Sequence, residues 1–165
     1  MTYKKRPYQS WHDLQIITDL AYGHGSNLLH VIDLPYRLAS WTLDKPQNFR
    51  FWYDHAENIA AVAIVQEAFL ALEYIIHPAA DKAFLEPDIV RWGLQRGQEI
   101  ANEQATTFPI NVWLSDDPPQ PDRVSLLEEN GLALSSRKSV TLQCDLSNIK
   151  LPNDKLVPTG IKVRR

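Results

Sequence analysis

The sequence predicts a mixed α/β fold of the α+β kind, with a mostly antiparallel sheet covered by helices on both faces. Two observations predict it: three strand-like segments follow one another in mid-chain, and a strand–helix–strand crossover comes next. The chain has 165 residues, 44% of them hydrophobic and 22% charged. It is therefore long enough for one domain with a single core and too apolar to be disordered.

Eleven elements are expected along the chain. In order they are a strand over 4–8, helices over 11–22 and 33–43, strands over 49–53, 59–65 and 69–77, a long helix opened by Pro87, a strand over 109–114, a short helix over 122–130, and strands over 132–134 and 140–146.

Capping and turn residues define the first three elements. Pro7 restricts the first strand to a sheet edge or a strand end, because proline donates no backbone hydrogen bond. Ser10 and Asp13 form a capping pair for the first helix. Asp33 caps the second helix, with Pro35 in its first turn.

Periodicity defines the elements that follow. The segment 49–53 is aromatic-rich, and 69–77 alternates, with Leu72 and Tyr74 on one face. Apolar residues at helical spacing follow Pro87, and the segment 109–114 is expected to be a buried strand. Gly131 ends the short helix in a left-handed conformation.

Composition excludes several classes of protein. The net charge of −3 provides no field for nucleic acid or for an anionic membrane surface. The start MTYKKRPYQS is not a signal peptide, and no apolar run is long enough to span a membrane. The single cysteine, Cys144, rules out an internal disulfide framework. A cytoplasmic protein is expected.

The order of the elements resembles the GNAT superfamily of acetyl-CoA-dependent N-acetyltransferases from about residue 4 to residue 145. The most telling segment is the strand end YIIHP (74–78), followed by a helix containing DIVRWGLQRG (88–97). LLEENGLAL (126–134) is similar to the late helix–glycine–strand element of that family. The resemblance implies a GNAT-like acyltransferase domain over 1–146.

The last residues suggest a second lobe. The segment 147–165 contains prolines and ends in the strand-like IKVRR, which is similar to KKRPY at the start. In tandem GNAT proteins a linker and a first strand of this kind lead into the second lobe. The resemblance therefore implies a partner, either a second GNAT lobe or a homodimer partner. The alternative is that these residues form only a frayed basic tail.

The resemblance assigns acetyl-CoA to the loop after the strand that ends at Pro78. It implies cofactor contacts at Ile75, Ile76, Asp81, Lys82 and Phe84. Family members place glycines in this loop so that backbone N–H groups and a helix N-terminus reach the pyrophosphate. The chain has no glycine between Gly25 and Gly93, so side chains block the close approach.

Charge in the same loop also opposes an anionic cofactor. Asp81, Glu86 and Asp88 are expected around the pyrophosphate position, opposed only by Lys82, and Pro87 is expected to remove one N–H donor of the first helical turn. We expect acetyl-CoA to bind weakly or not at all.

Two residues are candidates for proton transfer. By alternation, Glu73 faces the side of the sheet opposite to Leu72 and Tyr74. If that side lines a cleft, its carboxylate would act as a general base for an amine. The alternative, which we favour, is an outward-facing carboxylate. His77 lies at the strand end and is the histidine to test for acid–base chemistry. The tyrosine that the family often places in the late helix is Leu127 here.

The resemblance places an acceptor substrate beside the second helix. By position it implies substrate contacts at Tyr36, Arg37 and Trp41, and we add Trp52 to this aromatic wall. Most of these rings are also expected to fill the core.

Other chemistry is poorly supported. The five histidines have no helical i, i+4 pair and predict no metal site. Ser26 in GHGS lacks the strand–turn–helix setting of a nucleophile, and Cys144 is expected to be a buried apolar residue.

Three functions follow. The first is a lobe with a degenerate acetyl-CoA loop that supports a second, active lobe. The second is an active N-acetyltransferase acting on a small amine. The third is a module that binds a small ligand through its aromatic wall.

Overall fold

The computed structural model describes residues 2–24, 38, 43–68, 70–107, 109–114 and 119–136. The chain divides into two compact units, Met1–Leu134 and Ser135–Arg165. All helices and strands given below belong to the first unit.

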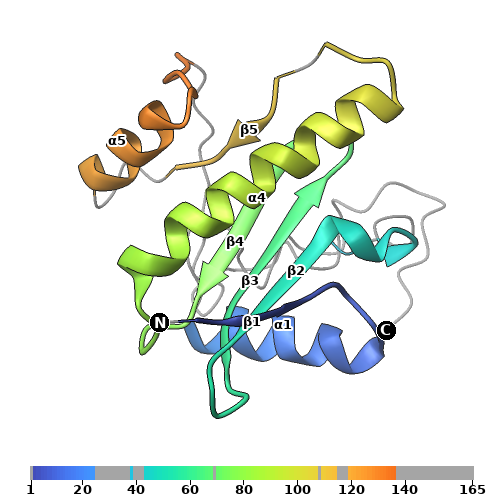
Figure 1. Ribbon diagram of the computed structural model, residues 1–165, viewed down its shortest axis with the longest axis vertical. Coiled ribbons are helices and arrows are strands. Elements are labelled where there is room, and N and C mark those ends of the chain that lie inside the picture. The colour runs from blue at the N-terminus through green and yellow to red at the C-terminus, as the bar shows by residue number, and fades with distance from the viewer. Residues whose placement is uncertain are drawn as a thin grey trace, which may run out of the picture. The chain divides into compact units, whose positions relative to one another are not determined.

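The described part of the chain forms one five-stranded sheet in the order β1-β2-β3-β4-β5 (Figure 1). The first four strands are antiparallel neighbours, and β5 runs parallel to β4. The mixed, mostly antiparallel sheet is therefore confirmed. The bounds are β1 Lys4–Arg6, β2 Phe49–Tyr53, β3 Ile59–Gln66, β4 Ala71–Ile76 and β5 Asn111–Val112.

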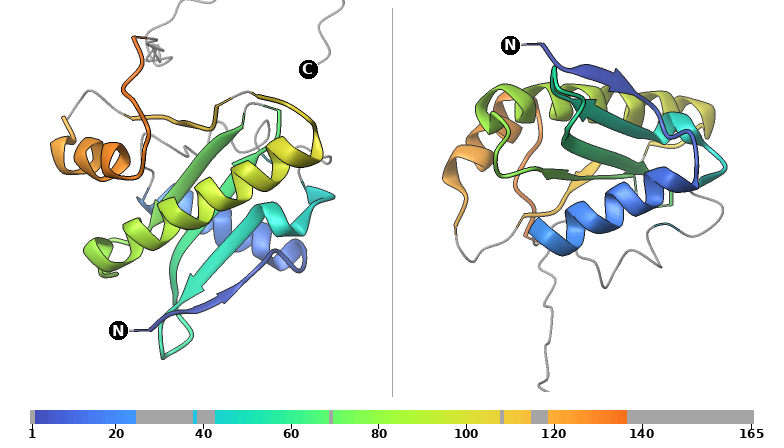
Figure 2. Two further views of the ribbon diagram at one scale, coloured as in Figure 1. Left: turned by 45° about the horizontal axis from the view of Figure 1, so that its top comes forward. Right: turned by 90° about the horizontal axis from the view of Figure 1, so that it is seen from below.

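Helices cover both faces of the sheet, as predicted (Figure 2). Helix α1, Trp11–His24, packs on one face, where Phe49 and Phe51 of β2 are buried with Ile17. Helix α4, Lys82–Glu103, packs on the other face against Trp52. The alternation of β2 thus places its phenylalanines and its tryptophan in two different cores.

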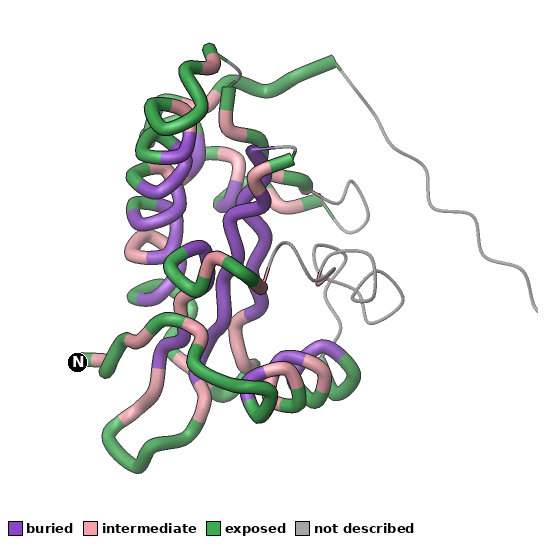
Figure 3. The backbone as a smooth tube through the Cα atoms, turned by 90° about the vertical axis from the view of Figure 1, so that its right-hand side faces the viewer, coloured by how far each residue is buried: buried purple, intermediate pink, exposed green. Residues whose placement is uncertain are grey.

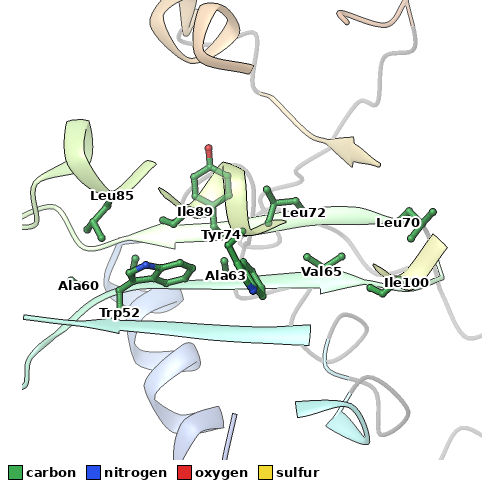
Figure 4. Packing of buried hydrophobic residues seen from close by; sticks show 12 residues of the cluster. Trp52, Ala60, Ala63, Val65, Leu70, Leu72, Tyr74, Leu85, Ile89 and Ile100 are labelled. Carbon is green, nitrogen blue, oxygen red and sulfur yellow. The ribbon is translucent and has the colours of Figure 1, made fainter. Parts of the chain in front are cut away.

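The deepest burial lies in the middle of the sheet (Figure 3). Strand β3 is buried from Ala60 to Gln66, which fits its nearly continuous apolar sequence. On the α4 side, Leu72 and Tyr74 of β4 pack with Leu85 and Ile89 of the helix (Figure 4).

The long helix begins five residues earlier than predicted. It starts at Lys82 rather than at Pro87, because Asp81 caps it: the Asp81 carboxylate accepts the Phe84 N–H at 3.1 Å. Pro87 lies inside the helix, where it leaves out one internal hydrogen bond.

The C-terminal part departs from the prediction in two places. Strand β5 covers only Asn111–Val112 and is not buried, whereas a buried strand over 109–114 was expected. After α5, Pro121–Glu129, residues 132–134 form no strand, and Leu134 is 74% exposed. The left-handed stop at Gly131 is confirmed by its φ of 86°. The strand expected over 140–146 and nearly all of the helix expected over 33–43 lie outside the described residues.

Candidate functional site

Strands β4 and β5 pair only where both begin. Ala71 pairs with Asn111 and Leu72 with Val112, and the Asn111 N–H donates to the carbonyl of Leu70 at 2.6 Å. Beyond this point β4 continues to Ile76 with no described strand on its β5 side. Among the described residues, the pairing of β4 with β5 therefore ends at Leu72 and Val112.

The N-terminus of α4 lies at the end of the loop that follows β4. Its side-chain cap is Asp81, whose carboxylate takes the Phe84 N–H. A free helix N-terminus presents such donors to an anion, but here one of them already holds a carboxylate of the chain. Phe84 itself is 46% exposed, and its ring lies 5.9 Å from that of Tyr3.

Glu86 and Asp88, which were expected around the pyrophosphate position, lie beyond the first turn of α4. Because the helix starts at Lys82, its first turn holds no acidic residue. Asp88 accepts hydrogen bonds from Lys5 at 2.9 Å and from the indole N–H of Trp52 at 2.7 Å. Because α4 starts at Lys82, Pro87 lies beyond its first turn and removes no N–H donor there. The Asp81 cap and the missing glycines therefore remain as the obstacles to a pyrophosphate.

Glu86 belongs to a buried cluster with Tyr74 and Arg123. The Tyr74 hydroxyl donates to Glu86 at 2.7 Å and accepts from Arg123 Nε at 2.7 Å, and Arg123 Nε lies 2.9 Å from Glu86 Oε1. The guanidinium also lies over the Tyr74 ring, 4.3 Å from its centroid. These three side chains join β4, α4 and α5.

The hydroxyl of Tyr74 stays neutral in this cluster. Burial raises the pKa of Tyr74; the Arg123 guanidinium lowers it and the Glu86 carboxylate raises it, with a strong net increase. The hydroxyl can therefore donate to Glu86 and accept from Arg123 at once. Sequence analysis missed this cluster, although Arg123 and the buried Leu127 lie four residues apart on one helix face.

Glu73 is buried, contrary to the outward position that we favoured. It is 1% exposed and accepts a hydrogen bond from Gln66 Nε2 at 3.2 Å. Leu72 and Tyr74 belong to the core under α4 and Ile75 to the core under α1, so Glu73 lies on the α1 side, as the alternation predicted.

His77 comes directly after β4. Its N–H donates to the carbonyl of Ala60 at 2.8 Å, and its Nδ1 accepts the N–H of Ala79 at 3.1 Å. Glu73 and His77 are four residues apart along one extended strand, about 13 Å at the usual rise. The two predicted catalytic residues are therefore not brought together.

The other predicted site residues lie in separate places. Ile75 is buried, and Ile76 is half-buried against the α4 core. Lys82 lies 3.6 Å from Glu86, with its side chain 61% exposed. Trp52 is fully buried and packs edge-on against Trp92, with ring centroids 5.8 Å apart. The remaining candidates lie outside the described residues: Ser26, Tyr36, Arg37, Trp41 and Cys144.

The residues after β4 do not fit acetyl-CoA. The resemblance calls for a glycine-lined loop and a free helix N-terminus, whereas Asp81 caps the helix and the Phe84 side chain stands in place of a glycine. Among the described residues, no group of three or more His, Cys, Asp or Glu could hold a metal ion. No described helix is long and apolar enough to cross a membrane.

Comparisons with known proteins find similarity to solved structures. No protein-family model matches the sequence, and no curated protein matches it. The crystal structure of glucosamine-6-phosphate N-acetyltransferase from Arabidopsis thaliana is similar to this chain with a TM-score of 0.49 and 12% sequence identity. The similarity covers 88% of this chain and 99% of that chain.

Proposed function

We propose that this chain is a GNAT-like domain that does not bind acetyl-CoA itself and supports a second, active acetyltransferase lobe. The order of strands and helices and the short parallel pairing of β4 with β5 support the GNAT-like assignment. The observation that carries the loss of the cofactor site is the Asp81 carboxylate on the Phe84 N–H.

An incoming pyrophosphate would meet two obstacles near α4. It would have to displace the Asp81 carboxylate, and like charges at one helix end repel. It would also meet the Phe84 side chain where close approach needs glycine.

The partner in this proposal is a second GNAT lobe, continuous with the segment 147–165 or contributed by a second copy of the chain. The domain described here would stabilise that lobe or shape its site for a small amine. The two well-buried cores, one between α1 and the sheet and one between the sheet and α4, suit such a supporting role.

A second candidate is an active N-acetyltransferase acting on a small amine. The burial of Glu73 favours it, because Glu73 is the first residue of β4 beyond the part that pairs with β5. A carboxylate there could take a proton from an amine.

Acetyl transfer by the complete protein to a panel of small amines separates the two candidates. We expect Glu73→Gln and His77→Ala to retain most of the activity, because the chemistry belongs to the other lobe. A loss of 100-fold or more with Glu73→Gln, at unchanged melting temperature, would establish the active-domain alternative, since general bases typically contribute about 10²–10⁴-fold. No transfer by the unaltered protein to any amine would contradict both.

A further inference from the structure

An open pocket of about 640 Å³ lies on the first unit where β4 ends. The β2–β3 turn, the start of the chain, helix α1 and the loop before α4 all contribute to it, and His77 lies in its wall. This volume is within the usual range for small-molecule sites, about 300–1,000 Å³. The pocket includes His77 and the loop residues Ala79 and Ala80, but neither Asp81 nor Glu73.

The walls of the pocket combine apolar and aromatic surface. Ile16, Ile59 and Ala80 provide apolar contacts, and Tyr3 and Tyr53 provide two rings. The half-exposed ring of Phe84 lies beside Tyr3 and extends this aromatic surface. The pocket walls would therefore make apolar contacts with a ligand that has an apolar or aromatic body, along most of its length.

Hydrogen bonds hold two of these walls in position without any ligand. The Tyr53 hydroxyl accepts from Arg6 Nη2 at 2.6 Å, and Arg6 is itself fixed by Asp13. On the opposite side, the bond from the Ala79 N–H to Nδ1 fixes the ring of His77. A preformed wall loses little entropy when a ligand binds.

The charged groups of the pocket are carboxylates. Asp54 and Glu57 line it from the β2–β3 turn. The Asn58 side chain and N–H lower the pKa of Asp54, and Lys4 lowers the pKa of Glu57, so both are ionised at neutral pH. Lys4 pairs with Glu57, and the Arg6 guanidinium, which lies 5.1 Å from the centroid of the Tyr53 ring, is paired with Asp13. Asp54 therefore leaves the rim of the pocket with a net negative charge, which attracts ammonium groups.

We propose that this pocket binds a small amine, with its ammonium group at Asp54 and Glu57 and its apolar body against Tyr3, Tyr53 and His77. The proposal does not rest on the proposed function, since binding requires neither acetyl-CoA nor a second lobe. It would make this domain the part of the protein that recognises a small cationic compound.

Three probes of the same shape and different charge test the proposal on the whole chain: 2-phenylethylamine, 2-phenylethanol and phenylacetate. Chemical-shift changes in NMR titrations report both affinity and location. We expect the amine to bind about fivefold more tightly than the alcohol, as for an exposed ion pair, with shifts at Tyr3, Tyr53 and His77. Equal binding of all three, tighter phenylacetate, or shifts elsewhere would overturn the proposal.

Two variants locate the site. Asp54→Asn/Glu57→Gln removes the charge but keeps polar side chains in the turn, and should remove the fivefold preference for the amine. Glu128→Gln/Glu129→Gln, on exposed positions of α5, makes the same change in net charge and should leave the preference intact. Ala79→Trp fills the pocket from its exposed edge and should weaken binding of the amine about tenfold. An unchanged affinity in a variant that melts at the wild-type temperature would contradict the assignment.

Discussion

The carboxylate of Asp13 joins the first strand to the first helix although it is almost fully buried. It accepts from Arg6 at 2.9 and 2.6 Å and from the backbone N–H groups of Gln9 and Ser10 at 2.6 and 3.3 Å. The predicted capping pair thus works through the Asp13 side chain, which reaches back to Ser10. The sequence indicated the pair, but not that Arg6 would complete it.

Removing this charge should destabilise the domain. Asp13→Asn leaves the Arg6 guanidinium without its carboxylate partner, and we expect the free energy of unfolding in urea to fall by about 3 kcal/mol. Asp19→Asn is the matched control, because Asp19 is exposed on the same helix; it should change the stability by less than about 0.5 kcal/mol. Equal effects of the two variants would contradict the role of Asp13.

The ionisation of Asp13 should make the stability of the domain depend on pH. Burial raises the pKa of Asp13, but the hydrogen bonds from Arg6, Gln9 and Ser10 outweigh this, so the pKa is lowered from its ordinary value of 3.8. The unfolded state then binds more protons, and the stabilisation, complete above about pH 5, is lost as pH falls through the folded value. Urea unfolding between pH 2 and 7 should show the gap between wild type and Asp13→Asn narrowing at low pH. A gap independent of pH would contradict this.

At the scale of elements, α4 approaches β4 closely because Gly93 has no side chain. A Cβ at this position would lie 2.4 Å from Leu72 Cδ2 and 2.9 Å from its Cγ, and Leu72 is itself buried. The helical stripe was predictable from the sequence, whereas the role of Gly93 needs the distance between helix and strand.

Gly93→Ala should therefore cost stability despite the better helix propensity of alanine. We expect a loss of about 2 kcal/mol, since overpacking a core forces neighbours out of place. Gly23→Ala is the control: it lies in α1, and its Cβ would have nothing within 4 Å. That variant should gain about 0.5 kcal/mol. Urea unfolding measures both, and a stabilised Gly93→Ala would refute the close packing.

Helix α5 is fastened by the buried cluster around Arg123. Arg123→Met leaves the Glu86 carboxylate buried without its guanidinium and should lower the free energy of unfolding by about 3 kcal/mol. Arg123→Met/Glu86→Leu removes both charges and should recover most of that loss. Comparison of the double variant with the two single variants measures the coupling energy between Arg123 and Glu86. If the losses in unfolding free energy of Arg123→Met and Glu86→Leu simply add, the two residues act independently.

At the scale of the whole molecule, the sheet and its two helical layers were predictable because alternation and helical spacing are local patterns. The start of α4 was misplaced because Pro87 is a common first-turn residue, whereas the helix begins five residues earlier, after its cap Asp81. The cluster of Tyr74, Glu86 and Arg123 was missed because its members come together only through the fold. Residues 132–134 are mostly exposed and form no strand.

The central claim is that the end of α4 that would hold a pyrophosphate is filled by Asp81. Thermal melting of the chain with acetyl-CoA up to millimolar concentration tests it most directly. Ligand at 100 times its dissociation constant would stabilise the fold by about 2.7 kcal/mol, a shift of several degrees. We predict no shift in melting temperature. A saturable increase would contradict the account and return the cofactor site to this domain.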